Sequence, residues 1–484
     1  MTTNVLSLEL KKITTDWFEQ NEAKIAKGST VDSPSELLAY ERRLFLLLVQ
    51  LGALIIALVL KTRIADKEFQ DIAAERIVPK NSKHYRNQAY LWTTITTSFG
   101  NIVRLKTRYY SLRRSRGRKR RWGKRGKNGS GIYPALELLG IRDGVTPTLA
   151  ADIAREVTEG PSMEAVQERF ARLGLSFDIK LIQRISEAFA EIGLLLRSTW
   201  AATGGRIATP LILDGETLEG KRVMLGTDGG RIRIRKSKRG RKPKGGRSGF
   251  WSDWREPKLL VIRIIDDTGK VVRELPSIYD GTLGNANDLF ALFEAHLRAR
   301  HIELASEIIC MSDGSKWIWD RMGSMLEGLG VDPAKVFYGV DYFHAVEHLA
   351  LVADNRRGWT QKHRRHWLNK MKALLKMGKV DVVIDELWKL AIGRNAPSIV
   401  SEIGYFEGHK ERMRYDILQE RNLPIGSGTV ESAIRQVVNM RLKSTGMFWL
   451  EENAEAFLHL RCFLKSSRWA VVEKAIIEYQ IARS

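Results

Sequence analysis

The sequence predicts an α/β protein, in which a mixed sheet is interrupted by a helical insertion and preceded by a helical, strongly basic region. Three observations indicate this fold class. After Gly205, short runs of β-branched residues alternate with amphipathic stretches, as in a sheet covered by helices. Before that point, apolar residues recur mostly at helical spacing. Lysine and arginine are concentrated in two acid-free runs.

The length and the net charge of the chain limit its possible functions. A chain of 484 residues corresponds to about three domains. Its formal net charge of +23 creates a long-range positive field, which favours a polyanionic partner, with nucleic acid as the leading candidate. The two cysteines, Cys310 and Cys462, exclude a disulfide framework and a four-cysteine zinc site. We therefore expect a reducing, cytoplasmic environment.

The first segment, residues 1–90, is predicted to be helical. Residues 44–60 are apolar except for Gln50 and reach the lower length limit of a membrane span, about 17 residues. The periodic pattern begins earlier, near Glu36, so we expect a buried helix and no membrane. A membrane-associated protein is the alternative. Residues 1–21 lack the apolar core of a secretory signal, and none is expected.

The second segment, residues 91–145, combines a predicted hairpin with a basic block. Aromatic and β-branched residues between Leu91 and Leu105 indicate the hairpin. Thirteen Lys or Arg residues and no acid lie between Arg104 and Lys127, which indicates phosphate contact, or alternatively a solvated loop. The residues predicted to bind DNA here are Arg113, Arg114, Arg116, Arg118, Lys119, Arg120, Arg121, Lys124 and Arg125.

The third segment, residues 146–205, has the pattern of a helix-turn-helix. One helix starts at Pro147, a second covers residues 163–173, and a third covers residues 177–192 after a turn at Gly174. The third helix could enter a major groove and present Lys180 and Arg184 to the bases. Any helical hairpin would give the same pattern.

The fourth segment, residues 206–345, predicts three strands followed by helix, strand, helix and strand. The strands are residues 223–228 continuing into 231–235, then 259–265, 271–279, 308–312 and 336–340, and the helices are 287–300 and 316–329. Asp228 and Asp313 lie at strand ends, so adjacent strands would bring their carboxylates together. Two ionised carboxylates in close proximity repel each other unless a cation neutralises them. Carboxylate oxygens are ligands that favour Mg²⁺ or Mn²⁺.

A third carboxylate is predicted from the last segment, residues 421–484, which follows a helical insertion at residues 346–420. A Gly-Ser-Gly turn leads into a helix whose first turn contains Glu431. Each acid also has a simpler interpretation. An Asp-Gly pair is common in turns, Asp214 competes with Asp228 as the first ligand, and Glu431 could simply favour the helix N-terminus.

Three motifs in this order, Gly226–Gly229, Ser312–Ile318 and Gly426–Ser432, resemble the DDE transposases of bacterial insertion sequences, whose catalytic domain has the RNase H-like fold. The resemblance covers residues 223–461. It implies that Asp228, Asp313 and Glu431 hold two Mg²⁺ (or Mn²⁺) ions. These ions would activate a water or a 3′-hydroxyl and stabilise the leaving oxygen.

Two further matches extend the resemblance. Asp341–His344 is similar to an Asp-x-x-His element, which implies that His344 acts near the site, although a core histidine is the alternative. Residues 441–449 resemble the segment after the catalytic glutamate. Paired cysteines of relatives are absent, so no zinc-held DNA-binding module is expected. Further predicted DNA contacts are Arg233, Arg235, Lys238, Arg239, Arg241, Arg435, Arg441 and Lys443.

The resemblance implies a transposase that binds double-stranded DNA at the ends of a mobile element, cuts them and joins them to target DNA. Two ends must be handled together, so we expect a homo-oligomer on DNA, in the cytoplasm at the nucleoid. The alternatives are a metal-dependent nuclease or resolvase of the same fold and a non-catalytic DNA-binding protein derived from a transposase. Trp317, Trp319 and Trp449 are expected in the core, or one could hold a flipped base.

Overall fold

The computed structural model describes residues 3–78, 85–112, 131–213, 215–238, 249–356, 358–393, 396–444 and 446–482. The chain forms two compact units. The first contains residues 1–157, 162–189 and 476–484, and the second contains residues 158–161 and 190–475. The finer division into six segments stays a prediction. The predicted DNA contacts from Arg113 to Arg125, together with Asp214, Arg239 and Arg241, lie outside the described residues.

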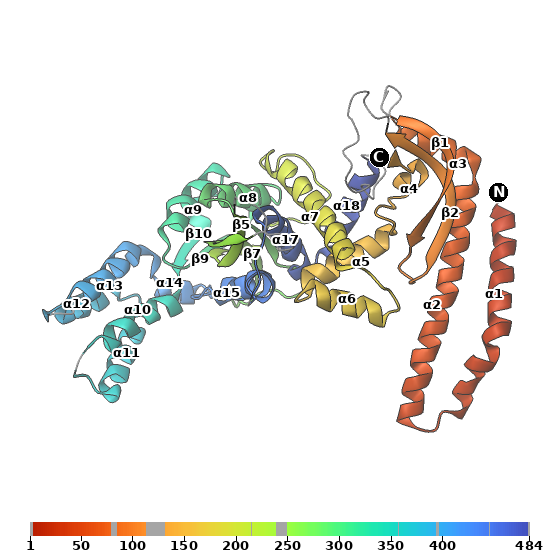
Figure 1. Ribbon diagram of the computed structural model, residues 1–484. Helices are drawn as coiled ribbons and strands as arrows, with labels where there is room; N and C mark the ends of the chain where they lie inside the picture. The colour runs from red at the N-terminus through yellow and green to blue at the C-terminus, as the bar shows by residue number, and fades with distance from the viewer. Residues whose placement is uncertain are drawn as a thin grey trace. The chain divides into compact units, whose positions relative to one another are not determined.

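The first unit begins with two long helices, α1 (Thr3–Ala26) and α2 (Pro34–Ala65), joined as a hairpin and followed by α3 (Lys67–Ile77) (Figure 1). Ser33 caps α2 by accepting a hydrogen bond from the Glu36 amide, and Pro34 occupies the first turn.

Helix α2 is not the buried helix that the sequence predicts. Its buried residues are Leu47, Leu60 and Ile64, whereas Leu37 and Phe45 are among several exposed apolar residues. The reason is geometric, because α1, α3 and β2 cover only part of its circumference. In the described part of the chain, α2 is the one helix long and apolar enough to cross a membrane by length and composition, which is weak evidence for a membrane span.

The predicted hairpin is confirmed as β1 (Tyr85–Thr96) and β2 (Ile102–Leu112), to which β3 (Gly131–Ile132) adds a short third strand. The register pairs Leu91 with Thr107 and Ile95 with Val103. Alternate apolar side chains of this hairpin pack with α2, α3 and α4 (Pro134–Leu138) in a small core.

The three helices predicted for residues 146–205 are confirmed as α5 (Pro147–Glu159), α6 (Met163–Arg172) and α7 (Ile179–Ala201). Gly174 in the turn after α6 has a φ of +81°, a conformation that favours glycine. Arg184 forms an ion pair with Asp143 at 2.8 Å, and its side chain is still half exposed. DNA contact by Lys180 and Arg184 stays a prediction.

The second unit is built on a mixed five-stranded sheet with the strand order β10-β9-β4-β7-β8. Its strands are β4 (Arg222–Gly229), β7 (Lys258–Ile265), β8 (Ile278–Thr282), β9 (Glu307–Ser312) and β10 (Val336–Val340). Strands β4, β9 and β10 are parallel, whereas β4, β7 and β8 form an antiparallel meander. The predicted strand 271–279 starts only at Ile278, because Pro276 cannot donate to a ladder; Val271 makes a single bridge.

Helices cover both faces of the sheet. On one face, α8 (Ala286–Arg298) and α9 (Lys316–Gly328) pack against alternate strand residues such as Val223 and Ile308. On the other face lie α15 (Gly428–Ile434), which contacts β4, and α17 (Glu451–Lys465), which contacts β8. A π-helical turn (Arg435–Asn439) and α16 (Met440–Leu442) connect these two, and α18 (Trp469–Ala482) ends the chain.

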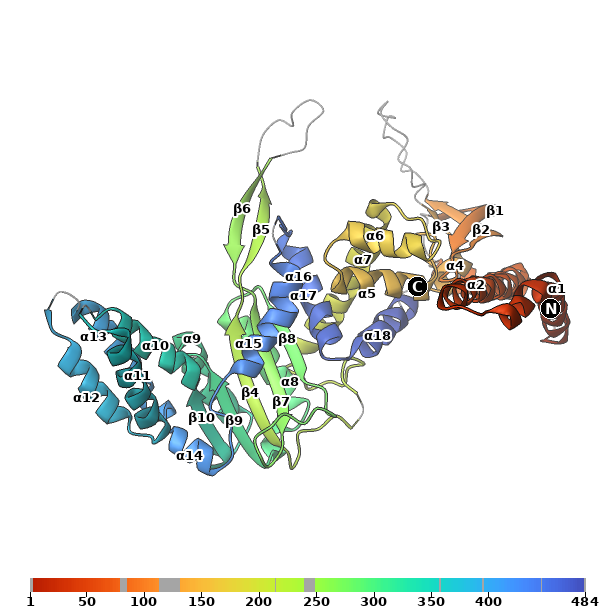
Figure 2. The same ribbon diagram turned by 90° about the horizontal axis from the view of Figure 1, so that it is seen from below.

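The predicted helical insertion follows β10. It consists of α10 (Tyr342–Asp354), α11 (Gln361–Lys376), α12 (Val380–Leu390), α13 (Ala396–His409) and α14 (Tyr415–Glu420). A separate hairpin, β5 (Ile232–Ser237) and β6 (Phe250–Arg255), continues from β4 and projects from the sheet (Figure 2).

Candidate metal centre

Three aspartates end three adjacent strands at the same level of the sheet. The parallel register pairs Leu225 of β4 with Cys310 of β9, so Asp228 and Asp313 each follow three residues later. Val340 of β10 pairs with Ser312, which sets Asp341 beside Asp313. Parallel pairing therefore creates a row of carboxylates from residues that are far apart in sequence.

Because side chains alternate along a strand, the positions of these aspartates determine on which face of the sheet their carboxylates lie. Asp228 shares its face with Met224 and Gly226, the face that α15 covers. A Cβ atom on Gly226 would lie 2.4 Å from Cγ2 of Val430 and 2.9 Å from the backbone oxygen of Met311. Only glycine permits this approach. Glu431 follows Val430, so the same contact brings the helix of the third predicted carboxylate to this face; the carboxylate itself groups within 4.8 Å with Asp341 and His344, and not with Asp228 and Asp313.

Asp341 acts as a connector between β10 and the turn before Glu431. Its carboxylate accepts hydrogen bonds from the amides of Phe343 (2.6 Å), His344 (3.1 Å) and Ser427 (2.5 Å), and from the Ser427 hydroxyl. Burial by itself raises the pKa of Asp341, but the His344 side chain, the two bonds from Ser427 and the His344 amide outweigh burial and lower the pKa to about 2. Since its acceptor positions are occupied, Asp341 positions the Gly-Ser-Gly turn and has little capacity left for a metal.

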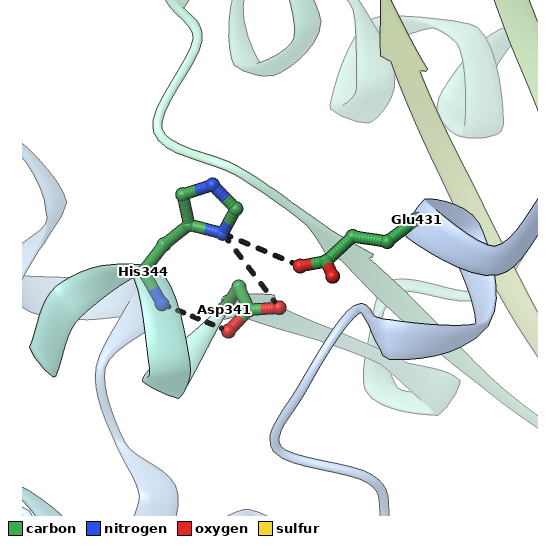
Figure 3. A group of neighbouring side chains, drawn as sticks. All are labelled: Asp341, His344 and Glu431. Atoms are coloured by element: carbon green, nitrogen blue, oxygen red, sulfur yellow. Dashed lines mark hydrogen bonds and ion pairs between the residues drawn. The ribbon is translucent and has the colours of Figure 1, made fainter. Parts of the chain in front are cut away.

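His344 lies beside the glutamate, as the sequence resemblance implies (Figure 3). Its Nδ1 is 3.8 Å from Oε1 of Glu431 and 4.0 Å from Oδ2 of Asp341. One ligand atom from each of these three residues lies within 4.8 Å of the others. The nearby Asp341 carboxylate is the main cause that raises the pKa of His344 to about 9, so the imidazole is a cation at neutral pH.

The pKa of Asp228 depends on both of the other predicted acids, Asp313 and Glu431. Burial is the main reason that the pKa of Asp228 rises to about 6, and the like charges of Asp313 and Glu431 add to the rise. The Gly229 amide and His344 oppose it. Four carboxylates, with Asp341 included, thus face one imidazolium. Additional positive charge would relieve this repulsion, and the carboxylate oxygens of Asp228, Asp313 and Glu431 are the donors that Mg²⁺ and Mn²⁺ prefer.

The side chain of Asp313 is held in place by its own loop. The amide and the hydroxyl of Ser315 each donate to its carboxylate at 2.9 Å, and Nε1 of Trp319 donates to its backbone oxygen at 2.7 Å. Trp317 and Trp319 pack against the core of the unit, and Trp449 is buried. Trp449 therefore has the core placement that the sequence predicts, whereas Trp317 and Trp319 are only partly buried.

The predicted DNA contacts after Glu431 fall into two groups. Arg435 and Lys443 are exposed. Arg441 is only 4% exposed and stacks on Trp449 at 5.0 Å, and burial lowers its pKa to about 10. The predicted DNA contact by Arg441 does not agree with this burial, because the Trp449 ring and the surrounding core cover its guanidinium.

The structural role of Arg461 could not be inferred from the sequence. This buried arginine donates from Nε to the backbone oxygen of Val437 and from NH2 to that of Gln436. Both carbonyls belong to the π-helical turn after Glu431, where the usual helical hydrogen-bond pattern is broken. Arg461 therefore stabilises the helix that carries the glutamate, and so does Ser427 on its N-terminal side.

Comparisons with known proteins do not identify a family: no protein-family model and no curated protein matches this chain. Functional inference rests on the geometry described above.

Proposed function

We propose that this protein is a DNA transposase that cuts and joins DNA with two divalent metal ions held by Asp228, Asp313 and Glu431. The observation that supports this most is the parallel register of β4 and β9, which sets Asp228 and Asp313 at the same level of the sheet, with the helix of Glu431 packed against Gly226. The strand order, with an antiparallel meander beside parallel β9 and β10, is the arrangement expected of an RNase H-like domain.

In the proposed reaction, the bound metals supply charge neutralisation, a nucleophile activated at neutral pH and stabilisation of the leaving oxygen. The two aspartates and the glutamate fix the donor geometry. Ser315 orients Asp313, and Asp341 orients the turn before Glu431. His344, a cation beside Glu431, is placed to contact a phosphate oxygen or to hold a proton near the leaving group.

The net charge of +23 favours a DNA substrate. Arg233, Arg235 and Lys238 follow Asp228 directly in the chain, and Arg435 follows Glu431 by one helical turn, so these cations flank the acidic row. The protein would act on two element ends together, as a homo-oligomer on DNA at the nucleoid.

The test is DNA cleavage and joining by the full-length protein in Mg²⁺, using a plasmid that carries the DNA flanking its own gene. We expect nicked or linear donor and joined products with wild-type protein, and neither with Asp313→Asn. Asp320→Asn is the matched control, because Asp320 is an exposed acid on α9 close in sequence to the site.

The products separate the alternatives. Cleavage without joined products would favour a nuclease or resolvase. Binding of the flanking DNA without any metal-dependent cleavage would favour a non-catalytic DNA-binding protein. Cleavage that survives Asp313→Asn would contradict the assignment of the site.

A further inference from the structure

Strand β6 in the hairpin next to Asp228 exposes large aromatic side chains. Phe250 and Trp254 are each 43% exposed, and Trp251 is 64% exposed. All six residues of β6 are exposed, so this strand pairs with β5 without being covered. Exposed tryptophan and phenylalanine are costly in water and typical of binding surfaces.

The two faces of this hairpin differ in chemistry. The register places Trp254 opposite Arg233 and Ser252 opposite Arg235, and Phe250 lies two residues before Ser252, so these five side chains share one face. We call this face, with Arg231 and Phe448, the cationic aromatic face; it consists of Arg231, Arg233, Arg235, Phe250, Trp254 and Phe448.

The planar groups of the cationic aromatic face form a continuous ladder. The guanidinium carbons of Arg231 and Arg233 lie 4.6 and 5.1 Å from the ring centre of Trp254. Arg233 also lies 5.6 Å from the ring centre of Phe448, whose ring is 5.1 Å from that of Phe250. Two guanidinium groups and three aromatic rings therefore follow one another along this face, and with Arg235 the face has three positive charges and no carboxylate among its six residues.

The opposite face is chemically distinct and offers a control. There Lys236 forms an ion pair with Asp253 at 2.9 Å, and Lys238 lies 4.3 Å from the ring centre of Trp251. Its positive charge is partly neutralised, and Ile232 and Ile234 of β5 are buried on that side.

The hairpin is fixed to the metal centre. Asp228 is joined to β5 by Gly229, Gly230 and Arg231, and the Gly230 amide donates to the Pro257 oxygen at 2.7 Å. On its other edge, β5 pairs with Trp449: the Arg235 amide donates to the Trp449 oxygen at 2.8 Å, and the Trp449 amide donates to the Arg233 oxygen at 3.0 Å. The hairpin that carries the cationic aromatic face is thus anchored at its base, next to Asp228, and along the outer edge of β5.

We propose that the cationic aromatic face binds unpaired nucleotides of the strand whose phosphodiester enters the metal centre, stacking their bases on Trp254 and Phe250 while the arginines contact phosphates. This rests on the proposed function. Unpaired bases are the favoured occupant because a grip on duplex phosphates needs only cations, whereas exposed aromatic rings gain from a base only when its face is free. The substrate would accordingly be a DNA end whose strands are separated locally.

The test is the affinity of full-length protein, in EDTA to prevent cleavage, for two labelled DNAs measured by fluorescence anisotropy. One is a blunt duplex, and the other is the same duplex with an unpaired extension of a few nucleotides. Wild-type protein should bind the extended DNA more tightly. Trp254→Ala and Phe250→Ala should each weaken that binding by about fivefold to a hundredfold, the range for loss of one stacked base, and change blunt-duplex affinity little.

Trp251→Ala is the matched control, because it removes a more exposed tryptophan of the same strand from the opposite face. Equal loss on both DNAs, or the same loss with Trp251→Ala, would overturn the inference, as would wild-type protein without preference for the extension. Trp254→Phe should retain the preference, which guards against a folding defect. Extension preference without Mg²⁺-dependent cleavage would refute the proposed function alone, and cleavage without the preference would refute this inference alone.

Discussion

Two aspartates of the same sheet, Asp228 and Asp280, meet opposite electrostatic surroundings. Asp280 on β8 is fully buried, yet it lies 3.2 Å from Arg197, 3.0 Å from His296 and 3.7 Å from His459. Burial by itself raises the pKa of Asp280, but Arg197 and the two histidines hold it well below its usual range. Asp228 has like charges beside it, and its pKa is raised to about 6.

The comparison shows how to separate a structural carboxylate from a functional one. A buried acid surrounded by donors contributes to stability as long as its partners remain, because its charge is already compensated. An acid among other acids costs stability in the free protein and gains from a bound cation.

The largest effect is expected for Asp228→Asn on catalysis. Loss of one metal-holding carboxylate should reduce single-turnover cleavage by about 10⁴-fold, or ~5.4 kcal/mol in the barrier. The free energy of unfolding in urea should stay the same or increase, because a source of repulsion is removed. If the variant instead unfolds at lower urea concentration and cleaves DNA at the wild-type rate, Asp228 stabilises the fold and does not hold a metal.

Asp280→Asn should have the reverse profile. It removes a carboxylate that lies 3.2 Å from the buried Arg197 and leaves Glu455, at 2.8 Å, as the remaining ion-pair partner, and breaking a buried pair costs about 3–5 kcal/mol of stability. Urea denaturation monitored by circular dichroism measures this, with Asp320→Asn as a control that should be neutral. If Asp280→Asn has the same free energy of unfolding as wild type, the interactions of Asp280 with Arg197, His296 and His459 do not stabilise the fold.

Asp341→Asn should produce an intermediate effect, because Asp341 supports the site without occupying it. Loss of the bonds to Ser427 should raise the Mg²⁺ concentration needed for half-maximal cleavage by about tenfold to a hundredfold. Ser427→Ala, which removes only the hydroxyl bond, should shift the same midpoint less. Abolished cleavage at every Mg²⁺ concentration would instead make Asp341 a direct ligand.

The smallest effect is expected in the pH dependence of the metal-free protein. The folded pKa of Asp228 lies above the unfolded value of about 3.9, so its contribution to stability is fully present below pH 4 and is lost as pH rises through about 6. The melting temperature of wild type relative to Asp228→Asn should therefore fall between pH 4 and pH 6. Mg²⁺ should reverse that loss above pH 6, and an unchanged difference across this window would contradict the raised pKa.

Several parts of the fold and of the site could be predicted from sequence. Strand and helix periodicities located β4, β7, β9, β10 and the helices between them, because that signal is local to each segment. The strand-end positions of Asp228 and Asp313 followed from the same patterns, and the Gly-Ser-Gly turn predicted where the helix of Glu431 begins. Parallel pairing of adjacent strands then made the approach of the two aspartates a reasonable expectation.

Other features were decided only by tertiary structure, since they depend on neighbours distant in the chain. The exposure of α2, the burial of Arg441 and the compensation of Asp280 by Arg197 and His459 are set by which surfaces meet. The role of Asp341 needed Ser427, 86 residues away. Sequence patterns report which residues could be buried or charged, but the free energy of a buried charge depends on the atoms that surround it in the folded chain.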